Sequence, residues 1–198
     1  MELQKVIKKR SMTRDFSTQS LSKEIIISIL KDSLNAPSAG FSQGVSYLVL
    51  FEKQDVDDFW QITSQENWRK SSDLAEGLMN APVVILPMVS ELSYRQRYSS
   101  YPKSGSYDIS TPYWYVDGGM SVMLALLRIE EEGLGALFIR IRENEDVLCK
   151  RFNFDASTYR PIGAILLGYP RDRSKFRGSQ NYISRKDPFS QIKFSKFC

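Results

Sequence analysis

Residues 8–16 have the sequence Lys8-Lys9-Arg10-Ser11-Met12-Thr13-Arg14-Asp15-Phe16, a basic stretch near the N-terminus. Apolar residues recur at helical spacing just before it, which predicts a helix over residues 2–10. The planar guanidinium groups of Arg10 and Arg14 suit phosphate oxygens, and the Ser11 hydroxyl and backbone N–H groups lie nearby. The stretch therefore indicates either a phosphate site or a solvated helix end.

A second informative stretch is the turn Ala36-Pro37-Ser38-Ala39-Gly40-Phe41-Ser42-Gln43-Gly44, which consists mostly of small residues. Before it, the pattern predicts a helix over residues 23–35, with Ser22 as its N-cap and Pro37 as its stop. After it, residues 45–51 predict a buried strand. Small side chains let a backbone approach a flat ring closely, although a simple helix stop and loop would use the same residues.

The remaining apolar patterns predict an alternation of strands and helices. Further buried strands are expected at residues 83–86, 136–139 and 162–167. Further helices are expected at about 55–66, 71–80, 113–132 and 143–152. This order predicts a mixed α and β architecture in a single domain of residues 1–198. The tyrosine-rich residues 93–114 predict a long loop of the kind that often belongs to a binding site.

The predicted helix at 113–132 carries information about assembly. From Val116 to Glu132 it is apolar nearly all round in its first half. Such a helix must be buried on more than one side. A central core helix would meet this requirement, but in a chain of 198 residues we favour burial against a second copy of the chain.

The composition excludes several classes of chemistry. Histidine is absent, which removes Ser-His-Asp and Cys-His catalysis and histidine-based zinc sites. The two cysteines, Cys149 and Cys198, do not form a disulfide framework or a metal-ligand spacing, so no metal is expected. A bound organic cofactor is the natural alternative, because it supplies the reactive atoms itself.

Other absences narrow the class of protein further. The chain contains no Gly-x-Gly-x-x-Gly motif after a strand and no Walker-type loop, which disfavours dinucleotide-binding and phosphate-loop folds. Its apolar runs are too short to span a membrane, and no secretory signal is visible, so we expect a cytoplasmic protein. The net charge of +4 would suit a nucleic-acid-binding module, yet no nucleic-acid-binding signature is present.

Five stretches in order resemble the FMN-dependent nitroreductase family. The first two are the basic stretch from Arg10 to Phe16 and the turn from Ala36 to Gln43. The others are Glu132-Gly133-Leu134-Gly135-Ala136-Leu137, Pro161-Ile162-Gly163-Ala164-Ile165-Leu166-Leu167-Gly168-Tyr169-Pro170 and Ser184-Arg185-Lys186-Asp187-Pro188-Phe189. The resemblance spans nearly the whole chain and implies an α+β fold with a central mixed or antiparallel sheet flanked by helices. It also implies an intertwined homodimer with a C-terminal extension that wraps the partner.

The resemblance further implies where FMN binds. Arg10, Ser11, Met12 and Arg14 would contact its phosphate and ribityl chain, and Arg185 and Lys186 would complete the phosphate site. The turn would lie along the flavin ring, from the other subunit, through Pro37, Ser38, Ala39, Gly40 and Gln43. The backbone at Arg140 and Ile141 would approach flavin N5.

The activity so implied is hydride transfer from NAD(P)H to the flavin, followed by electron transfer to an electron-poor small molecule by a ping-pong mechanism. No catalytic side chain is assigned, because the flavin carries the chemistry. Phe41 and Trp114 are the candidate substrate-contacting residues. The Phe41 that follows Gly40 also resembles the sequence of the branch of the family that fragments flavin to dimethylbenzimidazole. Flavin fragmentation is therefore the alternative activity.

Overall fold

A computed structural model describes residues 2–100, 111–141, 144–174, 178 and 182–195. Its strands are β1 (Val45–Leu50), β2 (Val83–Val89), β3 (Gly135–Ile139), β4 (Arg160–Pro161) and β5 (Ala164–Gly168). Its helices are α1 (Leu3–Lys9), α2 (Lys23–Ser33), α3 (Lys53–Thr63), α4 (Glu66–Ser71), α5 (Asp73–Met79), α6 (Glu91–Ser99), α7 (Tyr113–Glu131), α8 (Glu145–Phe152) and α9 (Pro188–Gln191), with a short 3-10 turn η1 (Ala39–Phe41).

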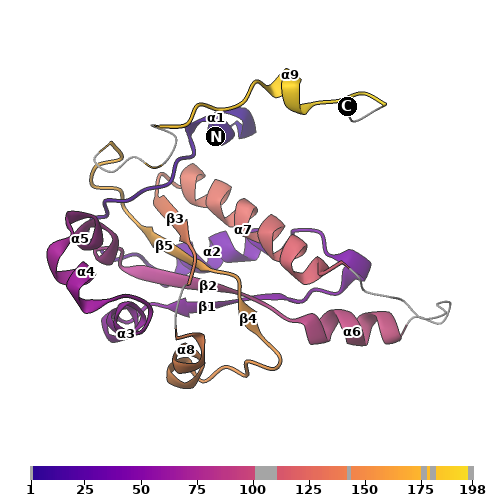
Figure 1. Cartoon of the computed structure of the whole chain (residues 1–198), viewed down its shortest axis with the longest axis horizontal. Coiled ribbons are helices and arrows are strands. Elements are labelled where there is room, and N and C mark those ends of the chain that lie inside the picture. The colour runs from indigo at the N-terminus through magenta and orange to yellow at the C-terminus, as the bar shows by residue number, and fades with distance from the viewer. Residues whose placement is uncertain (1, 101–110, 142–143, 175–177, 179–181, 196–198) are drawn as a thin grey trace.

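The strands form one antiparallel sheet in the order β1-β2-β5-β3, and β4 pairs with the C-terminal end of β2. Helices α2 and α7 cover one face, whereas α3, α5 and α8 lie against the other (Figure 1). The expected α+β fold with a sheet flanked by helices is therefore confirmed. Strand β3 is at one edge, and this edge lies beside the N-terminal segment.

The two faces of the sheet bury alternate residues, as the period of a strand requires. In β2, Val83 and Ile85 pack with α2 and α7, whereas Val84 and Leu86 pack with α3, α5 and α8. All four side chains are fully buried. A strand covered on both faces has no polar positions, which explains why residues 83–86 form a continuous apolar run.

Most predicted elements are present, and their ends differ by a few residues. Ser22 caps α2 as expected, since its Oγ accepts a hydrogen bond from the Ile25 N–H at 3.4 Å. The strand expected at 162–167 begins two residues later, as β5, and the short β4 precedes the predicted range. The short α4 lies where the prediction had a break between two helices.

The prediction of a loop over residues 93–114 is wrong for its first part, because α6 occupies Glu91–Ser99. Ser90 caps this helix by accepting a hydrogen bond from the Ser93 N–H at 3.2 Å, and Tyr94 is fully buried against Trp114. Apart from its tyrosines and the exposed Leu92, the helix is polar, so it has no apolar stripe that sequence periodicity could detect. Residues 101–110 of the predicted loop lie outside the described residues.

Candidate functional site

The basic N-terminal segment lies along the edge strand β3. Met12 forms a parallel bridge with Ala136, and the Thr13 N–H donates to the Ala136 carbonyl at 2.8 Å. Farther on, the Phe16 N–H donates to the Gly77 carbonyl at 3.0 Å, and the Phe16 side chain is fully buried. These contacts hold residues 12–16 in an extended conformation on the edge of the sheet.

Ion pairs fix both ends of this segment. Buried Asp15 accepts a bidentate hydrogen bond from Arg171, which follows β5, and this pairing raises the pKa of the Arg171 guanidinium. At the other end, buried Glu130 of α7 pairs with Lys9 at 3.3 Å and with Arg173 at 2.7 Å. Because both carboxylates are buried, removing their partners would leave charges that water cannot reach. These ion pairs therefore hold the segment in place at both ends.

Arg10 and Thr13 of this segment each have a buried polar atom, Arg10 Nη1 and Thr13 Oγ1, without a hydrogen-bond partner in the described part of the chain. Arg14 donates from Nη1 to the Met12 carbonyl at 3.1 Å, and Ser11 Oγ is 3.4 Å from Arg173 Nη1. A buried guanidinium nitrogen without an acceptor is costly, so an anion beside Arg10 would relieve that cost.

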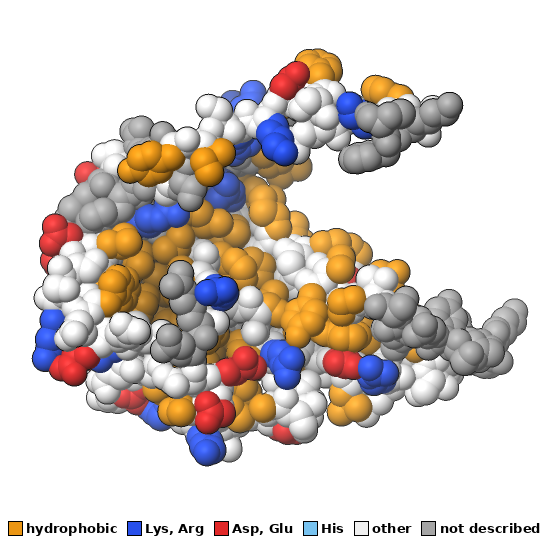
Figure 2. All heavy atoms as spheres, in the orientation of Figure 1, with side chains coloured by type: hydrophobic (Ala, Val, Ile, Leu, Met, Phe, Trp, Pro, Cys, Tyr) orange, Lys and Arg blue, Asp and Glu red, His pale blue; other side chains and the backbone are white. Residues whose placement is uncertain are grey.

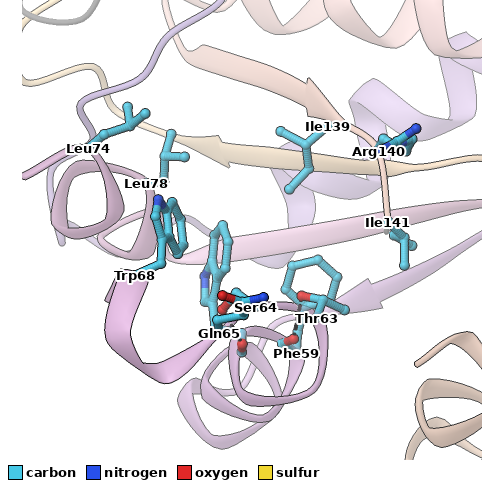
Figure 3. Close-up of a pocket in the computed structure, with 11 residues that line it drawn as sticks. Phe59, Thr63, Ser64, Gln65, Trp68, Leu74, Leu78, Ile139, Arg140 and Ile141 are labelled. Atoms are coloured by element: carbon cyan, nitrogen blue, oxygen red, sulfur yellow. Dashed lines mark hydrogen bonds between the residues drawn. The ribbon is translucent and has the colours of Figure 1, made fainter. Parts of the chain in front are cut away.

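A cavity of about 540 Å³ lies at the other end of β3. Figure 3 shows Trp68, Leu74 and Leu78 on one side of it and Ile139, Arg140 and Ile141 on the other. Trp60 also lines the cavity, with its ring centroid 6.0 Å from that of Trp68. Its indole nitrogen is buried and lacks an acceptor among the described residues. The aromatic walls, together with polar groups of Thr63, Ser64, Gln65 and Arg140, suit a planar ring with polar edges.

The turn around η1 lies elsewhere, at the start of α7. The Ala39 N–H donates to Asp117 Oδ2 at 2.8 Å, and Gly40 has φ of +61°. Phe41 is 71% exposed. Pro37 and Gln43 are also exposed, whereas Ser38 is half-buried and its Oγ accepts from the Gln43 N–H at 3.1 Å. The turn therefore presents backbone and one aromatic ring to its surroundings.

Most of the predicted site residues thus lie in two groups, the turn and the basic segment, which are far apart within one chain. The turn is attached to α7 at Asp117, and the basic segment is attached to the same helix at Glu130. With a rise of about 1.5 Å per residue, these thirteen residues place the two groups roughly 20 Å apart. One chain does not bring them together, and neither group alone encloses a ligand.

Arg185 and Lys186 lie in the C-terminal segment, which passes beyond α1 (Figure 1). Both are exposed and flank a shallow surface hollow with Pro188, Gln191 and Ile192. No contact with Arg10 or Arg14 is recorded for them within the described part of one chain. Trp114 is buried against Tyr94 and Tyr115, with only 8% of its surface exposed, so it acts in this chain as a core residue at the start of α7.

The sequence interpretation missed two groups of residues. The cavity side chains Trp60 and Trp68 come from α3 and α4, and Asp117 is a polar residue inside an apolar helix. A buried acidic residue in an apolar pattern is a usable signal, because such a group must find hydrogen-bond donors. The two tryptophans offered no comparable signal, since aromatic residues at helical spacing usually belong to a core.

The described residues contain neither a candidate metal site nor a candidate membrane-spanning helix. Among the residues that the structure describes, there is no cluster of cysteine and acidic side chains that could hold a metal ion. Within the same residues, no helix has the length and hydrophobicity needed to cross a membrane.

With this geometry in hand, we compared the chain with known proteins. A model of the nitroreductase family matches residues 7–169. The match covers most of the chain, so the protein belongs to the nitroreductase family, a class of oxidoreductases. A comparison with curated proteins found no match.

Solved structures share this fold over nearly the full chain. A protein from Clostridium acetobutylicum assigned as an NADH oxidase is 25% identical, with a TM-score of 0.69 and coverage of 97% of this chain and 99% of that one. A protein from Exiguobacterium sibiricum 255-15 assigned as a nitroreductase, solved in complex with FMN, is 18% identical, with a TM-score of 0.75 and coverage of 99% and 98%. A nitroreductase family protein from Clostridium difficile 630 is 18% identical, with a TM-score of 0.69 and full coverage of both chains.

Proposed function

We propose that this chain is an FMN-dependent oxidoreductase that takes hydride from NAD(P)H and reduces an electron-poor acceptor, such as a nitroaromatic compound or a quinone, by a ping-pong mechanism. The observation that carries the proposal is the placement of a basic segment at one end of β3 and an aromatic cavity at the other. Membership of the nitroreductase family supports it, as does FMN in the related structure from Exiguobacterium sibiricum.

The residues along β3 suit the shape and charge of FMN. Ala136, beside the basic segment, and Arg140, at the cavity, are four residues apart, which is about 13 Å along a strand. A ligand with a phosphate at one end, a linear polyol and a planar ring can follow this edge. When bound, FMN would supply the hydride-accepting ring that no side chain of this chain provides.

Each group of residues then has a role in binding or orientation. Arg10, with its unpartnered buried nitrogen, would bind phosphate together with Arg14, and Ser11 and Met12 would contact the ribityl chain. The backbone at Arg140 and Ile141 would face flavin N5 from the end of β3. Arg185 and Lys186 would add positive charge at the phosphate. Backbone N–H groups at Arg140 and Ile141 would stabilise the negative charge of a reduced ring, and the cations at the other end would hold the phosphate.

We further propose that the functional unit is a homodimer. The turn at η1 and the basic segment are roughly 20 Å apart in one chain, so a symmetric partner is the simplest way for both to contact one flavin. Exposed apolar residues on α7 and on the C-terminal segment support this arrangement. The C-terminal segment extends away from the body of the chain (Figure 2). In the dimer, Pro37–Gly40, Gln43 and Phe41 of one chain would face the ring bound by the other.

Purification and cofactor titration test the proposal. The purified protein should be yellow, with flavin absorbance close to one FMN per chain, and added NADH or NADPH should bleach that absorbance in the absence of oxygen. Steady-state rates with a nitroaromatic compound or quinone should give parallel lines in double-reciprocal plots. A colourless protein that does not bind added FMN would refute the proposal.

A further inference from the structure

The turn Ser38–Gln43 has a backbone conformation that is unfavourable on its own. Phe41 has φ of +54° and Gln43 has φ of +51°, in the left-handed region that residues with a Cβ seldom adopt. The Phe41 ring is 71% exposed, so its own packing contributes little to holding it there. A strained backbone of this kind persists only where its surroundings fix it.

Two helices hold the turn from outside. Asp117 of α7 accepts a hydrogen bond from the Ala39 N–H at 2.8 Å, and Arg97 of α6 donates to the Gly40 carbonyl at 2.8 Å. The ring of Tyr98 lies against Gly40, where an added Cβ would be 3.2 Å from Tyr98 Cζ. Arg97 is half-buried, whereas Asp117 is 2% exposed, so the Asp117 contact is the better shielded from water.

Asp117 is itself fixed in position. Its Oδ2 also accepts a hydrogen bond from the hydroxyl of Tyr94 at 2.5 Å, and Tyr94 is fully buried. Burial, followed by the contact with Asp117, raises the pKa of the Tyr94 hydroxyl, which therefore remains a donor at neutral pH. The next residue, Gly118, packs so closely on β2 that an added Cβ would be 2.7 Å from Val89 Cγ1. The helix backbone at Asp117 therefore cannot shift readily.

From these contacts we infer that Asp117 is a positioning residue, which holds the turn at Ala39 and thereby sets where the Phe41 ring is presented to the acceptor. The inference rests on the proposed function, because it takes the turn to be a wall of the flavin and acceptor site. It adds that the binding of the electron acceptor depends on the buried carboxylate of Asp117 on α7 as well as on Phe41. A planar aromatic acceptor is the class of substrate that a preset aromatic ring favours.

Ser121 provides a matched control on the same helix. It lies one turn after Asp117, is 1% exposed, and bonds to the Tyr47 hydroxyl at 2.7 Å and to the Ser33 carbonyl at 2.9 Å. Ser121→Ala therefore removes a buried hydrogen-bonding group from α7 without touching the turn. A purely structural role of Asp117 would give the same pattern of effects as Ser121.

The experiment compares Asp117→Ala, Asp117→Asn and Ser121→Ala in the flavin-loaded protein. Asp117→Ala should raise the KM for a naphthoquinone by about tenfold, because a hydrogen bond to a charged group is lost at the turn. Ferricyanide, which takes electrons without stacking on a ring, should retain its rate. Asp117→Asn keeps an acceptor oxygen, so its KM for the naphthoquinone should be close to the wild-type value. Ser121→Ala should change neither the KM for the naphthoquinone nor the rate with ferricyanide.

A readout independent of flavin completes the test. The amide proton of Ala39 should exchange with solvent faster in Asp117→Ala than in the wild type, but not in Ser121→Ala. If Asp117→Ala does not fold, Tyr94→Phe, which removes the second donor to Oδ2, should show a smaller change in the same direction. Equal behaviour of Asp117→Ala and Ser121→Ala would overturn the inference, whereas failure of the wild-type protein to bind FMN would overturn the proposed function.

Discussion

Arg10 illustrates how a single residue acquires a specific role only through its surroundings. In the sequence it belongs to a basic stretch that would also suit a solvated helix end. In the fold, one of its guanidinium nitrogens is buried without an acceptor among the described residues, while Lys9 and Arg173 are paired with Glu130 and Arg171 is paired with Asp15. These carboxylates neutralise the three cations and leave Arg10 available for an anion.

Replacing Arg10 by alanine should therefore weaken FMN binding more than it weakens folding. We expect a loss of about 1–3 kcal/mol in binding free energy, the range for a lost charge-assisted hydrogen bond. Arg185→Ala should weaken binding by a similar amount if the C-terminal segment reaches the phosphate. Flavin fluorescence titrations measure the affinity, and urea unfolding of the flavin-free protein measures stability.

Arg151→Ala is the control for these variants. It removes the same charge from an exposed ion-pair network with Asp55 and Asp58, on the helices α3 and α8. Flavin affinity should be unchanged in this variant. If Arg10→Ala and Arg185→Ala also retain the wild-type affinity, the phosphate assignment is wrong.

At the scale of elements, the sequence predicts a helix or a strand wherever its apolar residues follow a regular pattern. The strand β2 is buried on both faces, which gives a continuous apolar run, and α2 has one apolar face and a serine N-cap. Helix α6 was missed because Tyr94 and Tyr98 make its packing contacts and its other residues are polar, except for the exposed Leu92. Such contacts are tertiary, and no local pattern encodes them.

Helix α8 offers a direct test of this packing, because two neighbouring residues have opposite environments. Leu148 is fully buried in the cluster beneath the sheet, whereas Val147 is 43% exposed. Leu148→Ala should reduce the free energy of unfolding by about 2–5 kcal/mol, since it leaves a cavity in the core. Val147→Ala should change it by less than about 0.5 kcal/mol.

Urea denaturation of the two variants measures this difference. Because α8 follows the loop after Arg140 and Ile141, Leu148→Ala should also loosen flavin binding, and Val147→Ala should not. Similar stabilities for the two variants would show that α8 does not pack on the sheet as described.

At the scale of the whole molecule, the single chain leaves apolar surface uncovered. On α7, Val116, Met120 and Met123 are 49%, 36% and 41% exposed and recur at helical spacing on one face. The C-terminal segment adds Phe189 and Phe194, which are 85% and 89% exposed. Exposed apolar side chains of this kind support the proposed dimer, in which a second chain would cover them and bury α7 on more than one side.

A charged residue in this surface should disrupt the proposed dimer. Val116→Glu is expected to shift the protein to monomers and to lower its FMN content, because the turn and the basic segment would no longer meet. Light scattering after size-exclusion chromatography measures the mass, and absorbance measures the bound flavin. Val147→Glu, which places the same charge at a similarly exposed valine on α8, should remain dimeric and yellow.

The sequence by itself determined the local elements and the residue types at the candidate site, because periodicity, capping and small-residue turns are local properties of the chain. It predicted the basic segment Arg10–Arg14, the turn at Pro37–Gly40 and the strand that ends at Ile139. Only the tertiary structure placed the basic segment along β3, opened the cavity beside Trp60 and Trp68, and attached the turn to Asp117. These relations join residues far apart in the sequence, and they depend on how helices pack on a sheet, which no local pattern records.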